Sequence, residues 1–172
     1  MNGGKLLLVS SRFTIHRLRS DAMRLAEESH ARLEQFFRWF THDETLRLPA
    51  MYIHAGCLSH GLTKVLRIGA ITIGRHIFVS RDFLERDRRG QLTIQGRLLA
   101  HEAAHVRQFQ QAGFLPFLSD YLREYLTFLF RIRKFNAQAR RVAYKRITRE
   151  REARAVEFAY LEWRINVPSS SR

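Results

Sequence analysis

Apolar residues recur every three or four positions in several long segments of the chain, and this spacing predicts amphipathic helices. The first segment runs from Asp21 to Phe40, and two more cover Leu92–Ala112 and Pro116–Phe130. Gly113 lies just beyond the second segment, at a position where glycine commonly ends a helix. A fourth helix, strongly basic, is expected from about Phe135 to Trp163.

Between these helices the pattern changes to short β-branched runs that glycine interrupts. The segment Leu66–Ser80 predicts a β-hairpin or two short strands, with a turn at Gly74-Arg75. The segment Thr41–Gly61 contains proline and glycine, so it is expected to form loops with one strand near Met51–His54. The charged stretch Arg81–Gly90 is expected to be a loop or a short helix.

Together these elements predict an α+β fold, mainly helical, in which a small sheet packs on the helix at Leu92–Ala112. The chain has 172 residues, which suits one domain that buries a core without disulfides. We expect that domain to span residues 1–172, with its core at about 66–163 and a terminal tail at 167–172.

The motif His101-Glu102-Ala103-Ala104-His105 lies within one of the expected helices. Residues four apart lie on one helix face, so His101 and His105 can present two imidazoles to the same metal ion. Glu102 lies about 100° further round, where its carboxylate can reach a water molecule beside that metal and accept its proton. The motif therefore predicts a zinc site with Glu102 as the catalytic base.

A catalytic zinc ion normally takes three protein ligands, so a third residue is required. Histidine is excluded downstream, because no histidine follows His105 in the sequence. A downstream carboxylate is the remaining candidate. The carboxylates available are Asp120, Glu124, Glu150, Glu152, Glu157 and Glu162.

Three stretches resemble a known family: Ile73–Val79, Leu99–Gln108 and Glu150-Arg151-Glu152-Ala153. A His-Glu-x-x-His helix followed at a distance by a glutamate-bearing helix resembles the gluzincin metallopeptidases. More closely, the chain is similar to a bacterial metallopeptidase-like domain that is associated with extracellular contractile injection systems. The resemblance covers about Leu66 to Ala159 and implies a zincin-like fold.

The resemblance also implies a ligand set. In such gluzincins the zinc-binding glutamate stands three residues before the alanine, which corresponds to Glu150, with Glu152 as the rival. The family often has Asp or Asn four residues after this ligand to orient a zinc-binding histidine, whereas this chain has Arg154. The resemblance further implies that the strand Arg75–Ser80 binds an extended peptide by strand addition at a sheet edge; an ordinary core hairpin is the alternative.

These features predict a zinc metallopeptidase that hydrolyses peptide bonds in a peptide or protein substrate, with His101, His105 and Glu150 as metal ligands. Two alternatives remain open. One is a zinc-binding module that has lost turnover, which the residue at position 154 suggests; the other is a basic protein that binds nucleic acid or an anionic surface. The group that stabilises the oxyanion is also open, with candidates His76, Tyr144 and Tyr160.

The formal net charge is +14, and ten arginine or lysine residues lie between Arg131 and Arg154. Such a basic helix can bind an acidic partner, including nucleic acid or anionic lipid, although a solvated face is the commoner outcome for such residues. The aromatic residues along the third helix are expected to line the core or the active-site cleft rather than a membrane patch. They are Phe114, Phe117, Tyr121, Tyr125 and Phe128.

The remaining signals are weaker. Acidic and basic residues interrupt the apolar stretch Phe114–Phe130, so it does not predict a transmembrane segment. Cys57 is the only cysteine, and we predict no signal peptide, so a cytoplasmic location is expected. His54, Cys57 and His60 have metal-ligating side chains, but they lack a fourth ligand and lie beside glycines.

Overall fold

The computed structural model describes residues 12–17, 22–66 and 68–166, so the expected tail at 167–172 lies outside the described residues. Over this part of the chain the strands form one seven-stranded sheet in the order β4-β5-β3-β2-β1-β7-β6. Neighbouring strands are antiparallel except β3 and β5, which are parallel. The strands are β1 (Arg12–Arg17), β2 (Ala22–Leu25), β3 (Tyr52–His54), β4 (Ala70–Ile73), β5 (His76–Val79), β6 (Leu84–Arg86) and β7 (Leu92–Gln95).

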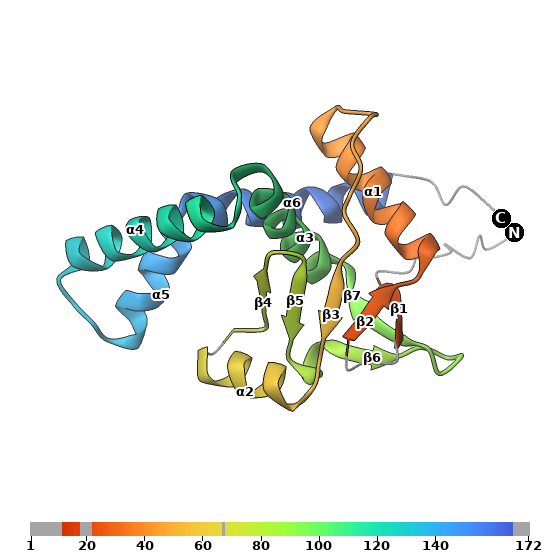
Figure 1. The fold of residues 1–172 in the computed structure, drawn as a ribbon, viewed down its shortest axis with the longest axis horizontal. Coiled ribbons are helices and arrows are strands. Elements are labelled where there is room, and N and C mark those ends of the chain that lie inside the picture. The colour runs from red at the N-terminus through yellow and green to blue at the C-terminus, as the bar shows by residue number, and fades with distance from the viewer. Residues whose placement is uncertain (1–11, 18–21, 67, 167–172) are drawn as a thin grey trace, which may run out of the picture.

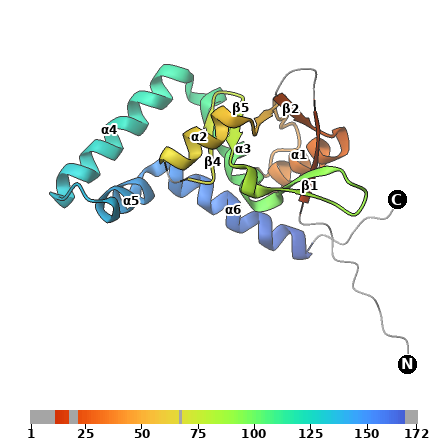
Figure 2. The same ribbon diagram turned by 90° about the horizontal axis from the view of Figure 1, so that it is seen from below.

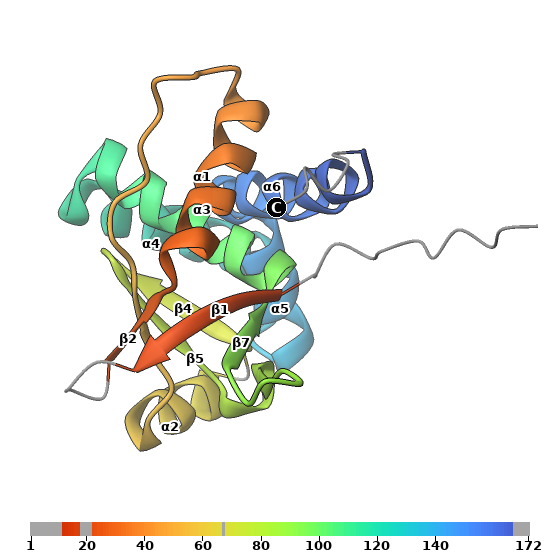
Figure 3. The same cartoon turned by 90° about the vertical axis from the view of Figure 1, so that its right-hand side faces the viewer.

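Helices lie on both sides of this sheet and extend beyond it. They are α1 (Glu27–Thr41), α2 (Cys57–Leu66), α3 (Gly96–Ala112), α4 (Phe114–Ile132), α5 (Ala137–Arg146) and α6 (Thr148–Asn166), with a short 3-10 turn at Arg81–Phe83. Helices α1, α3 and α6 lie on one side of the sheet, and α2 lies on the side away from them (Figure 3). Helices α4 and α5 form a hairpin that projects away from the sheet (Figures 1 and 2).

The hydrophobic core lies between the sheet and the helices α1, α3 and α6. Alternate strand residues such as Ile53 and Ile77 are fully buried on the inner face and meet Leu99 of α3. In the same core, Phe36 of α1 packs edge-to-face on Tyr160 of α6, with ring centroids 5.2 Å apart. Burying one aromatic side chain such as Phe36 stabilises the fold by about 1.5–3 kcal/mol. The core as a whole therefore holds α3 and α6 side by side.

The α+β class, mainly helical with a sheet packed on the motif helix, is confirmed by this arrangement. The predicted hairpin is present as β4 and β5, and Gly74 in the turn has a φ of +61°, which favours glycine. The strand near His54 is present as β3. Gly113 follows the motif helix with a φ of +82°, as expected for a residue that ends a helix.

Two predicted helices begin later than the sequence indicated, because each is preceded by a strand. In β2, Met23 and Leu25 are buried while Arg24 is exposed, which is the alternation of a strand. Helix α1 therefore begins at Glu27 rather than at Asp21. In the same way β7 occupies Leu92–Gln95, and the motif helix begins at Gly96.

Three further predictions were wrong in detail. The segment predicted as loops up to Gly61 contains helix α2, in which Gly61 lies inside the helix. The segment Arg81–Gly90 contains strand β6 after its short 3-10 turn. The single basic helix is two helices, because Ile147 between them has an extended ψ of 131° and is fully buried. None of the helices in the described part of the chain is long and apolar enough to cross a membrane.

Candidate metal site

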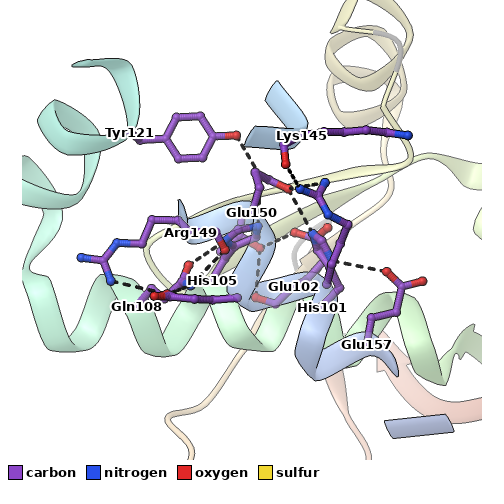
Figure 4. A network of polar contacts seen from close by, with 12 residues as sticks. His101, Glu102, His105, Gln108, Tyr121, Lys145, Arg149, Glu150 and Glu157 are labelled. Carbon is purple, nitrogen blue, oxygen red and sulfur yellow. Dashed lines mark hydrogen bonds and ion pairs between the residues drawn. The ribbon is translucent and has the colours of Figure 1, made fainter. Parts of the chain in front are cut away.

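Two helices bring a histidine pair and a carboxylate together. His101 and His105 lie one turn apart on α3, and Glu150 reaches them from the first turn of α6, which runs beside α3 (Figure 4). Nε2 of His101 lies 3.6 Å from Oε2 of Glu150, and Nε2 of His105 lies 3.3 Å from Oε1. The ligand atoms of all three residues lie within 4.8 Å of one another, so this group could hold a metal ion.

The types of donor atom fit a divalent transition metal. Two imidazole nitrogens and a carboxylate are a ligand set of catalytic zinc sites. Oε2 of Glu150 is buried and has no hydrogen-bond partner, a costly arrangement unless another group binds that oxygen. Nitrogen and oxygen donors that converge around an unsatisfied carboxylate are what a divalent transition metal requires.

Gln108 fixes the orientation of His105. Its side-chain NH₂ donates to the backbone oxygen of Arg149 at 3.1 Å and to Glu152 at 2.8 Å, so its amide oxygen is left as an acceptor. That oxygen lies 2.8 Å from Nδ1 of His105, which must therefore carry a hydrogen. The tautomer leaves the lone pair on Nε2, the nitrogen that faces Glu150.

Glu157 is the acid nearest to the other nitrogen of His101, although the two groups do not form a hydrogen bond. Its Oε2 lies 3.5 Å from Nδ1 of His101, on the side of the ring away from Glu150. Its other oxygen lies 3.4 Å from Nε of Arg97, so this carboxylate of α6 approaches two residues of α3. The resemblance placed an orienting acid at position 154, but the acid that approaches the histidine is Glu157. Arg154 instead donates to the backbone oxygen of Lys145, and its Nη1 lies 4.0 Å from Glu150.

Glu102 points from α3 toward strand β4. Its side chain is buried, and the Thr72 hydroxyl donates to its Oε2 at 2.7 Å. The same hydroxyl lies 3.3 Å from the Glu102 backbone oxygen. Thr72 therefore fixes one carboxylate oxygen of the motif glutamate and ties the motif helix to the edge strand of the sheet.

The charges of this site favour a bound proton when no metal is present. Burial raises the pKa of Glu150, but the neighbouring imidazoles of His101 and His105 and the Tyr144 hydroxyl hold that pKa well below its ordinary value. Burial lowers the pKa of His105, but its hydrogen bond to Glu150 and the charges of Glu150 and Glu102 raise it above its usual value. A metal ion at this site must therefore displace a proton from His105.

Of the downstream carboxylates considered from the sequence, only Glu150 joins the histidines in the described part of the chain. Glu152 accepts from Gln108, and Glu124 accepts from the backbone NH of Thr148 at 2.6 Å, which caps the start of α6. Asp120 pairs with Arg123 on α4, and Glu162 is exposed on α6.

The three candidates for oxyanion stabilisation lie in different parts of the structure. Tyr144 hydrogen-bonds Glu150, so it is beside the metal-ligand group, and burial together with the Glu150 charge raises its pKa. His76 is exposed on β5 and Tyr160 packs in the aromatic core. Tyr121 was expected from the sequence only to line the core or the active-site cleft, and its hydroxyl donates to Oε1 of Glu150 at 2.8 Å.

The expected substrate strand was assigned to the wrong member of the hairpin. Strand β5, which contains most of Arg75–Ser80, pairs with β4 on one side and with β3 on the other, so it has no free edge. The edge strand is β4, and it is β4 that contacts α3 through Thr72. The sequence could not show this, because pairing of β5 with β3 joins segments more than twenty residues apart.

The weaker signals lie elsewhere. Nε2 of His54 lies 2.9 Å from Nδ1 of His76 on the sheet, and Cys57 is exposed near Arg81. Neither His54 nor Cys57 belongs to a three-residue metal group among the described residues.

Part of the basic segment lines a hollow of about 620 Å³ beside Phe128. Its basic lining residues are Lys145, Arg146, Arg151 and Arg154.

A family model described as the eCIS core domain matches residues 24–113, just over half of the chain. The matched region contains Thr72 and the whole motif from His101 to His105, but it ends before Glu150 and Glu157. No curated protein and no solved structure shows significant similarity to the chain.

Proposed function

The chain belongs to the eCIS core domain family, and we propose that it is a zinc-dependent metallopeptidase that works with an extracellular contractile injection system. One observation carries the proposal: two imidazole nitrogens and a buried carboxylate converge, with Glu102 next to them on the same helix. A His, His, Glu set with an open fourth position is the ligand arrangement of catalytic zinc in several peptidases.

Zinc, when bound, would acidify a water molecule and polarise the carbonyl of the scissile peptide bond. In the proposed reaction Glu102 accepts a proton from the attacking water and returns it to the nitrogen of the leaving amine. The Thr72 bond occupies Oε2 of Glu102, so we assign this proton to Oε1. Tyr144 and Tyr121 both hydrogen-bond Glu150, and we assign them to holding that ligand rather than to contacting the substrate.

We further propose that the substrate is an extended peptide that adds to the outer edge of β4. Strand β4 is at the end of the sheet and carries Thr72, which contacts the proposed base directly. A peptide paired with this edge would run past the motif helix with its backbone held by strand hydrogen bonds. The substrate strand is therefore Ala70–Ile73 in this proposal, one strand earlier than the sequence suggested.

Arg154 favours a second candidate function, a zinc-binding module without turnover. Its guanidinium lies 4.0 Å from Oε2 of Glu150 and would draw charge from that ligand. A metal bound by a weakened ligand set can serve structure without supporting hydrolysis. Glu157 argues for the enzyme, because it supplies the acid beside His101 that position 154 lacks.

The experiment that separates these candidates is proteolysis by the zinc-loaded protein on a peptide library read by mass spectrometry. We expect cleavage that stops when a chelator removes zinc and returns when zinc is restored. A protein that retains stoichiometric zinc but cleaves no peptide would support the module without turnover. Failure to retain zinc at all would contradict both candidates.

A further inference from the structure

Helix α4 carries a stripe of large apolar side chains on the face that points away from the rest of the protein. Leu115 is 74% exposed, Leu122 is 56% exposed and Phe130 is 61% exposed, and the exposed Leu126 lies between the last two. Steps of four or seven residues place these four side chains on one side of the helix. We call Leu115, Leu122, Leu126 and Phe130 the apolar ridge.

The opposite side of α4 is the one that packs. Phe117 is buried there, and Tyr121, four residues later, reaches Glu150 from the same side. Leu129, seven residues after Leu122, lies at the margin of the ridge and is buried with Ala139 and Ala143 of α5. The aromatic residues noted in the sequence mostly lie on this inner side, whereas the ridge consists of residues that were not singled out. The ridge is therefore additional to the surface that holds α4 in the fold.

The ridge ends at the tip of the hairpin, where aromatic and basic side chains meet. Phe130 and Phe135 contact each other there with ring centroids 6.0 Å apart, and both are 61% exposed. The tip also carries the exposed residues Arg131, Arg133 and Lys134. No carboxylate lies between Thr127 and Asn136, so the tip is purely cationic.

We propose that the apolar ridge and this tip dock the protein on an anionic lipid surface. An amphipathic helix that places leucine and phenylalanine on one face, with arginine and lysine beside them, lies in the interface plane of such a membrane. The tip cations meet the negative headgroups, and the paired phenylalanine rings sit at the level of the headgroups and upper acyl chains. The projection of α4 and α5 away from the sheet leaves this face accessible (Figure 2).

Charge complementarity makes lipid the occupant that we favour over a second copy of the chain. The protein carries a net charge of +14, and its tip has no acidic residue, so two tips brought together would repel. An anionic bilayer satisfies the ridge and the tip at once. The metal site is not involved, because the ridge faces away from Glu150.

The test is sedimentation of the full chain with vesicles of phosphatidylcholine, with and without phosphatidylglycerol. We expect binding to the anionic vesicles only, and weaker binding as salt increases. The double variant Leu122→Ser/Leu126→Ser should lower the partition coefficient by roughly tenfold or more. Each of Arg131→Gln, Arg133→Gln and Lys134→Gln should lower it about fivefold.

The matched control is Leu58→Ser/Val65→Ser, which replaces two exposed apolar residues of α2 and should leave vesicle binding unchanged. Circular dichroism checks that each variant is folded. The proposal is overturned if wild type does not sediment with anionic vesicles, or if the α4 double variant binds as wild type does. A ridge-dependent dimer in analytical ultracentrifugation, without vesicle binding, would assign the ridge to a second copy instead.

Discussion

The metal site between α3 and α6 and the outer face of α4 depart from ordinary burial in opposite ways. At the first, Glu102, His105 and Glu150 are buried although their side chains are polar or charged. At the second, leucine and phenylalanine are exposed although they are apolar. Folding alone favours neither arrangement, because buried polar groups and exposed apolar groups both cost free energy.

The two regions differ in how that cost is offset. The buried groups are held by neighbours inside the protein: Gln108 for His105, Thr72 for Glu102, and Tyr121 for Glu150. The ridge on α4 has no comparable neighbour in the described part of the chain. The fold itself therefore builds the metal site, whereas the ridge is left for an outside surface such as the proposed lipid.

The largest expected effect is on catalysis. Glu102→Gln keeps the size of the side chain but cannot accept a proton, so we expect peptide hydrolysis to fall by about 10²–10⁴-fold. Zinc content should not change, because Glu102 is not a proposed ligand. Zinc analysis and cleavage rates on the same preparation check this, and hydrolysis at the wild-type rate would show that another group is the base.

A smaller effect is expected where a neighbour only orients a ligand. Gln108→Leu removes the acceptor for Nδ1 of His105 and should weaken zinc binding by about 10–100-fold. Titration with a competing chromophoric chelator measures the affinity. The control is Gln110→Leu, an exposed glutamine on the same helix, which should bind zinc as wild type does. Equal affinities for both variants would remove Gln108 from the site.

The pH dependence of stability should reverse when metal is added. The folded pKa of His105 is raised above 6.5, so its contribution to stability is present below pH 6.5 and is lost as pH rises through the raised value. The pKa of Glu150 is lowered below 4.5, so its contribution is present above pH 4.5 and is lost as pH falls through the lowered value. Metal-free protein should therefore melt highest between these two pH values.

With zinc in excess, stability should instead rise with pH over the range where metal-free protein loses it, because zinc replaces the proton on His105. Thermal melts of both forms across this range provide the measurement. Parallel pH profiles for the two forms would contradict the coupling of metal and proton at this residue.

The smallest expected effect is on the stability of the free protein when the ridge is changed. Leu115→Ser should alter the free energy of unfolding by no more than about 0.5 kcal/mol, because this residue is 74% exposed. Leu99→Ala in the core should cost about 2–5 kcal/mol. Urea unfolding compares the two, and a large loss for Leu115→Ser would mean that the ridge is part of the folded core.

The parts of the site that depend on local spacing could be predicted from the sequence. His101 and His105 share a face because of the helical repeat alone, and Glu150 followed from a resemblance in its own helix. Thr72 could not be predicted, because its bond to Glu102 joins residues thirty positions apart and depends on which strand is at the sheet edge. Glu157 was one of six candidate metal ligands in the sequence. Its position beside Nδ1 of His101 depends on the packing of α6 on α3.

The fold shows the same limit. The hairpin at Gly74 was predictable, since turn and strand signals are local. The strand β2 was not, because Ala22, Leu25 and Ala26 fit both a helical spacing and a strand that leads into a helix. Pairing with β1 and β3 decides between them, and β3 lies about thirty residues away in the sequence.

The central claim is that His101, His105 and Glu150 bind one zinc ion, and zinc titration of metal-free protein tests it most directly. We predict one ion for wild type, a large loss of affinity for Glu150→Ala, and at most a modest loss for Glu152→Ala, whose carboxylate contacts Gln108 and Arg149 rather than the histidines. Equal and tight binding by wild type and Glu150→Ala, or no binding by wild type, would contradict the account.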